Sequence, residues 1–378
     1  MRIAYVCVDP GIPVFGTKGA SVHVQEIVRA FRARGDEVTL YCTRRGDHVP
    51  GDLGDVPVVE IAVGKGEPAE RERSVAEASR QLAARIVTDG CDLVYERFSL
   101  FSRVGAVVAG ATGAAFVLEV NAPLIEEQKQ HRDLVDETGA VAAAHDALAT
   151  ADVVACVSEP VAAWAAAHGG CSPLVVPNGV NTARIRPRDR GTDGPLRIGF
   201  VGTLKPWHGV EVLIDAVASL DDRATLTLVG DGPEGPALLA RAAERGVAVH
   251  STGALRPADV PAALAALDVG VAPYPPGAGY FSPLKVYEYL AAGLAVVASA
   301  IGQVPAIIDH GRTGLLVEPG SADALAAALA RLVDDRGLTG RLGAEGRADA
   351  VAHHDWTRVL DRILTALPDR TPREEVPA

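Results

Sequence analysis

Short runs of apolar residues alternate with longer amphipathic stretches along most of the 378-residue chain. Because these runs are apolar throughout rather than at every second position, both faces of each strand are expected to be covered. Strands of this kind separated by helical stretches predict parallel, doubly wound α/β sheets. The predicted strands are RIAYVCV, EVTLYC, VPVVEIAV, DLVYE, AFVLEV, DVVACVS, PLVVPNG, LRIGFVG, ATLTLVG, VAVHSTG, VGVAPY, AVVASA and GLLVEP.

The strand and helix pattern occurs twice. RIAYV opens the first half at 2–6 and RIGFV opens the second at 197–201. Between them, RIRPRDRGTDGP at 184–195 is rich in Arg, Gly and Pro, has little to bury and predicts an interdomain linker. We therefore predict Rossmann-like domains at 1–185 and 196–352, with an amphipathic helix and a frayed polar tail in 353–378.

The bulk composition restricts the classes of function. Hydrophobic residues make up 48% of the chain and charged residues 22%, which is typical of a globular protein. A net charge of −12 disfavours nonspecific nucleic-acid binding and does not indicate docking on an anionic membrane. We expect a cytoplasmic protein, because signal-peptide features and an apolar run of ~20 residues are both missing from the sequence. The five cysteines form no C-x-x-C pair and predict reduced, mostly buried thiols.

The first loop of interest follows the first strand. Ligands of doubly wound sheets bind beyond the carboxyl ends of the strands, near helix N-termini. Lys18, Gly19 and Ser21 stand where the loop PGIPVFGTKGAS meets a helix, which favours an approaching anion. An ordinary flexible loop with Ser21 as the helix N-cap is the alternative. G-x-G-x-x-G is missing there, which disfavours a dinucleotide-binding oxidoreductase.

The second loop opens the second domain. Gly202 and Gly209 bracket a segment with Lys205, Trp207 and His208, and a helix is expected to start near Gly209. A cation, an imidazole and free amide donors together predict a cradle for a diphosphate. The alternative is a structural loop in which Trp207 fills a gap.

The third segment is GYFSPLKVYEYLAAG at 279–293. The chain has only five Lys, and one of them, Lys285, stands at the start of a helix that begins near Pro283. Glu288 lies three residues further on and close to Lys285 in angle, so a surface ion pair worth about 0.2–0.5 kcal/mol is the alternative to a ligand site. The apolar YLAAG that follows places Glu288 at a buried boundary, where a carboxylate needs a partner such as two ligand hydroxyls.

The fourth segment is VLEVNAPLIEEQKQHR. Glu119, Asn121, Glu127 and His131 follow a buried strand, which indicates either a substrate site or a solvated loop before a polar helix. The sequence favours neither interpretation. Arg97, in YERFS, pairs either with an acidic acceptor or with Glu96 or a neighbouring helix.

Four segments resemble one known family. FVGTLKPWHGVEVLIDA, PLKVYEYLAAGLAVVAS, HGRTGLLVEPGSADALAAAL and VVPNGVN are similar to the retaining GT-B glycosyltransferases of family 4, the glycosyl transferases group 1 type. The likeness covers nearly the whole chain and is strongest from about 175 to 335. It implies two Rossmann-like domains facing a cleft for a nucleotide sugar, and a last helix that crosses back onto the first domain.

The resemblance also implies roles for individual residues. Glu288 matches the second Glu of the family's E-x7-E motif, which holds the donor ribose. The backbone at Pro283 and Leu284 is implied to approach the sugar and phosphates. Gly19 and Gly302 match glycines near the diphosphate and at a helix start of the nucleotide pocket.

The chain departs from the family pattern at three of these positions. Tyr280 replaces the first Glu of E-x7-E, and Thr203 and His208 replace the phosphate-binding Arg and Lys of G-R-L-x3-K-G. Lys205 and Lys285 are therefore expected to supply the positive charge at the diphosphate. Since the sequence has no D-x-D triplet, we expect these cations to replace a metal ion at the leaving group.

The expected enzyme transfers a sugar from a UDP- or GDP-sugar to a soluble small molecule or saccharide, without a further cofactor. Its predicted catalytic residues are Lys205, Lys285 and His208. Its predicted donor-binding residues are Gly19, Gly202, Thr203, Tyr280, Ser282, Pro283, Leu284, Glu288 and Gly302. Its predicted acceptor-binding residues are Lys18, His23, Arg97, Glu119, Asn121 and His131.

Two other functions compete with this one. A sugar-nucleotide epimerase or hydrolase of the same fold needs acid and base carboxylates near the sugar, and Tyr280 makes that a poorer match. A non-catalytic sugar-binding protein is not expected to be stabilised thermally by a nucleoside diphosphate. Neither the acceptor nor the oligomeric state follows from the sequence.

Overall fold

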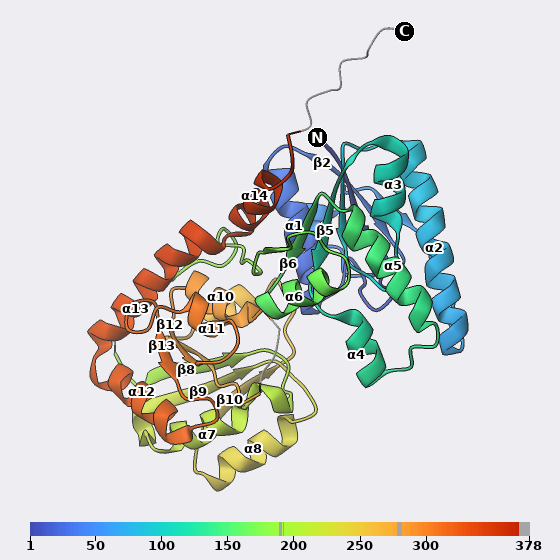
Figure 1. The fold of residues 1–378 in the computed structure, drawn as a ribbon. Coiled ribbons are helices and arrows are strands. Elements are labelled where there is room, and N and C mark those ends of the chain that lie inside the picture. Colours follow the sequence, from blue (N-terminus) through green and yellow to red (C-terminus); the bar gives the residue numbers. More distant parts are fainter. Residues whose placement is uncertain (189–190, 192, 278–281, 370–378) are drawn as a thin grey trace, which may run out of the picture. The chain divides into compact units, whose positions relative to one another are not determined.

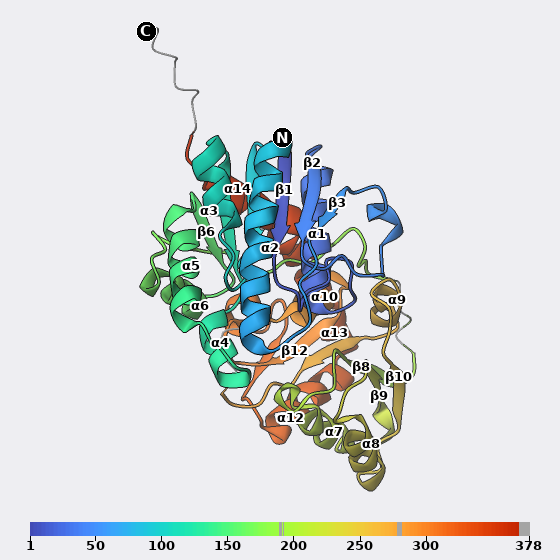
Figure 2. The same cartoon turned by 90° about the vertical axis from the view of Figure 1, so that its right-hand side faces the viewer.

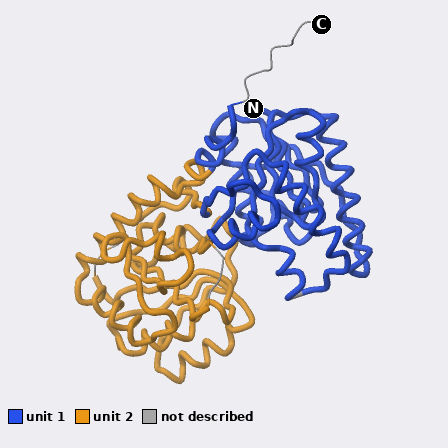
Figure 3. Tube along the Cα trace, viewed as in Figure 1, with its two compact units in different colours: residues 1–177, 360–378 blue, residues 178–359 orange. Residues whose placement is uncertain are grey.

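A computed structural model describes residues 1–188, 191, 193–277 and 282–369 of the chain (Figure 1). The chain forms two compact units, residues 1–177 with 360–378 and residues 178–359 (Figure 3). Each unit contains one sheet of parallel strands with helices packed against it. This architecture confirms the predicted α/β fold.

The sheet of unit 1 has seven strands in the order β3-β2-β1-β4-β5-β6-β7. The strand order reverses between β1 and β4, where successive connections leave on opposite sides, so a crevice opens beyond the carboxyl ends of these two strands. The strands are β1 (Arg2–Cys7), β2 (Glu37–Cys42), β3 (Val58–Glu60), β4 (Leu93–Arg97), β5 (Ala115–Val120), β6 (Val153–Cys156) and β7 (Leu174–Val175).

The helices of unit 1 cover this sheet, and α2, α3 and α5 pack side by side (Figure 2). Cys7, Cys42 and Cys156 are buried in the strands, as predicted, and burial raises the pKa of each thiol to about 12. The helices are α1 (Gly19–Ala33), α2 (Pro68–Asp89), α3 (Val104–Thr112), α4 (Leu124–His131), α5 (Glu137–Thr150) and α6 (Glu159–Ala167), with a 3₁₀ turn at Gly51–Leu53.

The sheet of unit 2 has six strands in the order β10-β9-β8-β11-β12-β13, with its reversal between β8 and β11. The strands are β8 (Leu196–Val201), β9 (Ala224–Val229), β10 (Val249–Gly253), β11 (Val269–Ala272), β12 (Ala295–Ser299) and β13 (Leu315–Val317). The helices are α7 (Val210–Ala218), α8 (Gly235–Glu244), α9 (Val260–Ala265), α10 (Leu284–Ala291), α11 (Val304–Ile307), α12 (Ala322–Asp334) and α13 (Arg336–Asp349). Two 3₁₀ turns, Pro206–His208 and Asp221–Arg223, and a π-helical turn, Ala350–His354, complete this unit.

Two apolar clusters hold unit 2 together, one on each face of the sheet. Side chains of α7, α8 and α12 pack in the first cluster, and side chains of α9, α10 and α11 pack in the second. Because both faces are covered, the strands are apolar throughout, which is the pattern that the sequence shows. Each of the thirteen predicted runs overlaps one of the observed strands, and twelve of them contain the whole strand; β4 extends one residue beyond DLVYE, to Arg97.

The last helix, α14 (Trp356–Thr365), begins in unit 2, and its residues from Leu360 onward belong to unit 1. An ion pair between Arg34 and Asp361 contributes to this attachment. The predicted return of the final helix to the first domain is therefore confirmed. Across the ranges that the structure describes, none of the helices has the length and hydrophobicity needed to span a bilayer.

The division between the units falls at Pro177 and Asn178 rather than after residue 185. Val180 pairs with Asp355 in an isolated bridge, and the Thr182 amide and hydroxyl donate hydrogen bonds to the Asp355 carboxylate. These contacts tie the segment that precedes the predicted linker to the second unit.

Candidate active site

Two glycines shape the loop that follows β8. Gly202 has φ 144°, and a Cβ added there would lie 3.2 Å from Cε of Lys285. Gly209 has φ 63°, and a Cβ added there would lie 2.1 Å from the Pro273 carbonyl oxygen. Both positions therefore need glycine for conformation, and Gly209 needs it for space as well. The α7 helix begins at Val210 with Gly209 as its N-cap, which confirms the predicted helix start.

Lys285 lies in the first turn of α10, half-buried between two aromatic rings. Its Nζ is 4.9 Å from the ring centroid of Phe200 and 5.1 Å from that of Tyr274, and it is 3.5 Å from the Tyr274 hydroxyl oxygen. Burial lowers the pKa of Lys285 to about 7, and the negative charge of Glu288 offsets part of that shift. The ammonium group is thus held by ring faces and poorly solvated, so an anion brought to it would interact strongly.

His208 lies beside Lys285 and is uncharged at neutral pH. Its Nδ1 donates a hydrogen bond to the Thr203 carbonyl oxygen at 2.6 Å, and its ring centroid is 5.4 Å from that of Phe200. Burial lowers the pKa of His208 to about 4, and the nearby charge of Lys285 adds to this effect. Since Nδ1 carries the proton, Nε2 of the neutral ring can only accept a hydrogen bond. Positive charge at this loop therefore comes from the lysines, as expected, and not from His208.

Lys205 is the N-cap of the 3₁₀ turn before α7, and Trp207 lies on that turn. Lys205 is half-buried, and its Nζ is 5.5 Å from the centroid of the Trp207 ring. Trp207 is 59% exposed. The alternative in which Trp207 fills a structural gap is therefore wrong, and its ring is available to a ligand.

The start of α10 gathers several of the predicted donor-binding residues. Pro283 is the buried N-cap, Leu284 is the first helical residue, and the Ser282 hydroxyl accepts a hydrogen bond from the Asn178 amide at 3.2 Å. Glu288 lies one turn into the helix and is half-buried, as expected from YLAAG. Tyr280 lies outside the described residues.

Two predicted glycines stand at other helix starts. Gly302 has φ 55° and lies two residues before α11, which has only four residues. Gly19 is the first residue of α1, with Lys18 as the N-cap, and both are exposed. Ser21 is buried within α1, so the alternative that made it the N-cap is wrong.

Four of the predicted acceptor residues meet in unit 1 around the Glu119 carboxylate. His23 Nε2 lies 2.8 Å from Oε1, and the Asn121 amide nitrogen donates to Oε2 at 3.0 Å. Arg97 Nη1 lies 3.5 Å from Oε2, and the Tyr95 hydroxyl donates to Oε1 at 2.8 Å. His131 is the last residue of α4, and its side chain lies outside the described part of the structure.

This cluster is buried and internally satisfied. Glu119 is 4% exposed, His23 3% and Arg97 9%. Burial alone would raise the pKa of Glu119, but the charges of His23 and Arg97 and the hydrogen bonds lower it to about 2. Arg97 therefore pairs with Glu119 and not with Glu96, whose carboxylate accepts from Ser102 and the Gly105 amide. The structure therefore shows these polar side chains paired with one another inside unit 1.

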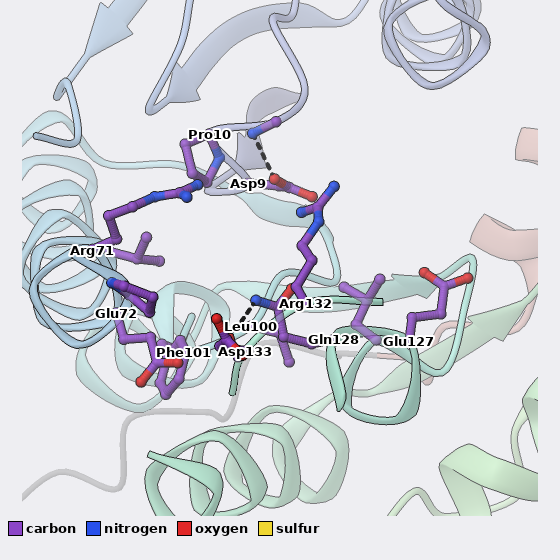
Figure 4. Close-up of a pocket in the computed structure, with 14 residues that line it drawn as sticks. Asp9, Pro10, Arg71, Glu72, Leu100, Phe101, Glu127, Gln128, Arg132 and Asp133 are labelled. Atoms are coloured by element: carbon purple, nitrogen blue, oxygen red, sulfur yellow. Dashed lines mark hydrogen bonds between the residues drawn. The ribbon is translucent and has the colours of Figure 1, made fainter. Parts of the chain in front are cut away.

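A cavity of about 520 Å³ in unit 1 is lined by residues that the sequence did not single out, apart from Glu127 (Figure 4). It lies beyond the carboxyl ends of β1, β4 and β5, where the strand order reverses. The rule that such reversals open a crevice could have located it, had the strand order been known. Its lining comprises Asp9, Pro10, Gly11, Pro68, Arg71, Glu72, Val75, Leu100, Phe101, Leu124, Glu127, Gln128, Arg132 and Asp133.

Comparison with known families agrees with this architecture. Residues 17–184 match the family model described as Glycosyltransferase Family 4, and residues 195–335 match the model described as Glycosyl transferases group 1. The chain belongs to the group 1, family 4 glycosyltransferases. It is therefore an enzyme that transfers glycosyl groups, as the resemblance implied.

This glycosyltransferase has bacterial relatives. It is 27% identical to the D-inositol 3-phosphate glycosyltransferase of Corynebacterium glutamicum over 89% of each chain. It is 34% identical to a GDP-mannose-dependent alpha-(1-6)-phosphatidylinositol monomannoside mannosyltransferase of Mycobacterium tuberculosis, over 49% of this chain and 53% of that one.

Solved structures share the fold of this glycosyltransferase. Anabaena HepE in complex with UDP has a TM-score of 0.74 and 21% identity over 97% of this chain and 99% of its own. A glycosyltransferase from Rickettsia africae has a TM-score of 0.74 and 17% identity over 96% and 97%. The GT-B assignment made from the sequence is therefore confirmed.

Proposed function

We propose that this glycosyltransferase moves a sugar from a UDP- or GDP-sugar to a hydroxyl of a soluble small molecule or saccharide, with retention and without a metal ion. The observation that carries the proposal is Lys285, which is held between Phe200 and Tyr274 at the start of α10. Among the described residues, Lys285 has no carboxylate within ion-pair distance. The leaving diphosphate would supply the missing negative charge.

The chemistry explains why a cation is needed there. The bond between the anomeric carbon and the diphosphate oxygen breaks, and its electron pair leaves with the nucleoside diphosphate. The acceptor oxygen bonds to the anomeric carbon on the same face, and its proton passes to the departing diphosphate. Lys285, with Lys205 and the free amides at the start of α10, would stabilise the growing negative charge and do the work of a metal ion.

The relatives narrow the choice of donor nucleotide more than they narrow the choice of acceptor. One relative is named as GDP-mannose-dependent, and HepE was solved with UDP, so both nucleotides stay candidates for this chain. The relatives' names cover an inositol phosphate, a phosphatidylinositol mannoside and glycogen as targets of transfer or synthesis. Since these differ widely, the acceptor has to be inferred from the cavity in unit 1.

A nucleotide and donor screen tests the proposal. UDP or GDP at 100 times its Kd should stabilise the protein by about 2.7 kcal/mol, measured as a thermal shift. Mass spectrometry should then show donor consumption and a glycosylated product, with the anomeric configuration read by NMR. Full activity in EDTA supports metal independence. A protein that ignores every sugar nucleotide, or that returns an epimerised donor without transfer, contradicts the proposal.

Replacing Glu288 with Ala is expected to weaken UDP or GDP binding by about tenfold, because a carboxylate that accepts from two ribose hydroxyls makes charge-assisted hydrogen bonds worth roughly 1.5–3 kcal/mol. Isothermal titration calorimetry with the nucleoside diphosphate measures this loss. Glu211→Ala on α7 is the control, since it removes a carboxylate from the first turn of another helix in the same unit. Unchanged affinity in Glu288→Ala would remove Glu288 from the ribose site.

Nucleotide affinity is also expected to fall as the pH rises above about 7. Lys285 of the free protein is protonated below that pH and loses its proton above it, whereas the bound diphosphate favours the charged form. Binding above pH 7 therefore requires proton uptake, and Kd should rise by up to about tenfold per pH unit. Calorimetric titrations in buffers of different ionisation enthalpy would measure the number of protons taken up when the nucleotide binds. The Lys285→Met variant should show no uptake, and a wild-type protein without it would contradict the assignment.

A further inference from the structure

The cavity of unit 1 contains four carboxylates and two arginines, and the carboxylates are largely satisfied by the protein itself. Both oxygens of Glu72 accept backbone amides, from Val135 and Asp136, at 2.8 Å. Asp9 accepts the Gly11 amide at 2.7 Å, and Glu127 also has an interaction of its own. Asp133 is exposed. The carboxylates of Glu72 and Asp9 therefore help to hold the loops of the cavity in place.

The two arginines of the cavity, unlike most of its carboxylates, form no side-chain hydrogen bonds or ion pairs with the described residues. Arg71 lies in the first turn of α2 and Arg132 is the C-cap of α4. Over the described ranges of the chain, neither guanidinium has an ion pair or a side-chain hydrogen bond. Other surface arginines of unit 1 do pair with carboxylates, for example Arg32 with Asp55 at 2.7 Å and Arg103 with Asp146 at 3.0 Å.

Figure 4 shows both guanidinium groups reaching toward the loop that carries Asp9 and Pro10. They approach this loop from different elements, so an anion placed there would be met from two sides. Guanidinium groups present two parallel N–H donors that match the oxygens of a phosphate or a carboxylate. An arginine pair without protein partners at a strand-reversal crevice is therefore suited to a ligand anion.

The remaining wall of the cavity suits the body of a small polyol. Phe101 has φ 64°, a left-handed conformation that is unusual for a bulky residue, and it lies in the lining beside Leu100 and Leu124. Backbone held in such a conformation tends to occur at ligand sites. Gln128 and the second carboxylate oxygen of Asp9 would bind hydroxyl groups.

From these observations we infer that the acceptor is a small polyhydroxylated molecule with an anionic group, a phosphate or a carboxylate, which Arg71 and Arg132 bind. The inference rests on the proposed transferase function, because it assigns the acceptor site to this cavity. The arginines would position the acceptor and select it by charge. They would not take part in breaking the glycosyl bond.

Calorimetric titration tests the inference with three charged probes: myo-inositol 1-phosphate, glucose 6-phosphate and glucuronate. Each is compared with its neutral counterpart, myo-inositol or glucose, in the 378-residue protein saturated with UDP or GDP, whichever of the two binds. At least one charged probe should bind at least tenfold more tightly than its neutral counterpart. The Arg71→Gln, Arg132→Gln double variant should lose that preference and bind the charged probe at least tenfold more weakly. Which probe binds distinguishes a phosphate from a carboxylate acceptor.

Arg73→Gln is the matched control, because Arg73 is exposed on the same helix but does not line the cavity. It should change binding of the charged probe by less than twofold. Equal binding of charged and neutral probes, no binding of any charged probe, an unaffected double variant, or an equal loss in Arg73→Gln would each overturn the inference. Nucleotide binding is read in the same samples. The absence of binding by both UDP and GDP marks a failure of the proposed function, whereas normal nucleotide binding without charge preference marks a failure of this inference alone.

Discussion

Replacing Lys285 with Met is expected to lower kcat by about 10²–10³-fold, the loss typical of removing one donor that stabilises a developing oxyanion. Met keeps much of the length and apolar surface of the lysine stem between Phe200 and Tyr274 but carries no charge. Steady-state transfer assays with the donor found in the screen would measure the effect. A loss in kcat and kcat/KM together would show that the ammonium acts mainly in the transition state.

The thermal stability of Lys285→Met tests whether its loss of activity comes from loss of folding. Burial lowers the pKa of Lys285 to about 7, well below its value in an unfolded chain, so the unfolded state binds more protons between pH 7 and 10.5. Wild-type stability from this group therefore rises with pH in that window and is lowest below pH 7. Lys285→Met removes the cost of burying the charge, so its Tm at pH 7 should be equal to or above that of the wild type. Wild-type kinetics in this variant would remove Lys285 from the diphosphate site.

Replacing Glu119 with Gln is expected to destabilise unit 1 by about 3–5 kcal/mol, because a buried arginine loses its carboxylate. Arg97 and Glu119 lie opposite each other in the register of β4 and β5, and both are at most 9% exposed. The change would leave the Arg97 guanidinium buried with an uncharged neighbour. Urea denaturation, with hydrogen exchange of β4 and β5 to assign the loss to unit 1, would measure it.

Glu96→Gln is the matched control from the adjacent strand. Glu96 is also buried, but burial raises its pKa to about 7, and a glutamine oxygen can still accept the Gly105 amide at 2.7 Å. Its cost should be about 1 kcal/mol. Since the pKa of Glu119 is lowered from 4.5 to about 2, its stabilisation is present above pH 4.5 and is lost as the pH falls toward 2. Glu119→Gln should flatten that acid dependence, and equal costs for the two variants would contradict the ion-pair account.

The sequence located the parts of the site that depend on local signals. The start of α10 at Leu284, next to Pro283, and the start of α7 after Gly209 follow from residue preferences within one helical turn. The same local signals could not predict which side chains surround Lys285. Phe200 and Tyr274 come from segments far from Lys285 in sequence, and only their approach holds the ammonium and lowers its pKa.

The polar residues of unit 1 show more clearly what the sequence could not predict. His23, Arg97, Glu119 and Asn121 are polar residues near strand ends, and the sequence could not distinguish an acceptor surface from an internal cluster. The structure joins them through one buried carboxylate. The cavity itself is lined by other residues, since which loops meet beyond a sheet depends on strand order, and strand order is not encoded locally.

The sequence by itself determined the thirteen strands, the two α/β units and the placing of Lys285 and Glu288 on one short helix. Hydrophobic periodicity and helix-start preferences act over a few residues, so they can be read directly from the chain. The tertiary structure alone decided that His208 is neutral, that Glu119 is an internal ion-pair centre and that two arginines face an open cavity. Charge state, pairing and shape depend on groups that are distant in sequence, and these meet only when the strands have taken their order in the sheet.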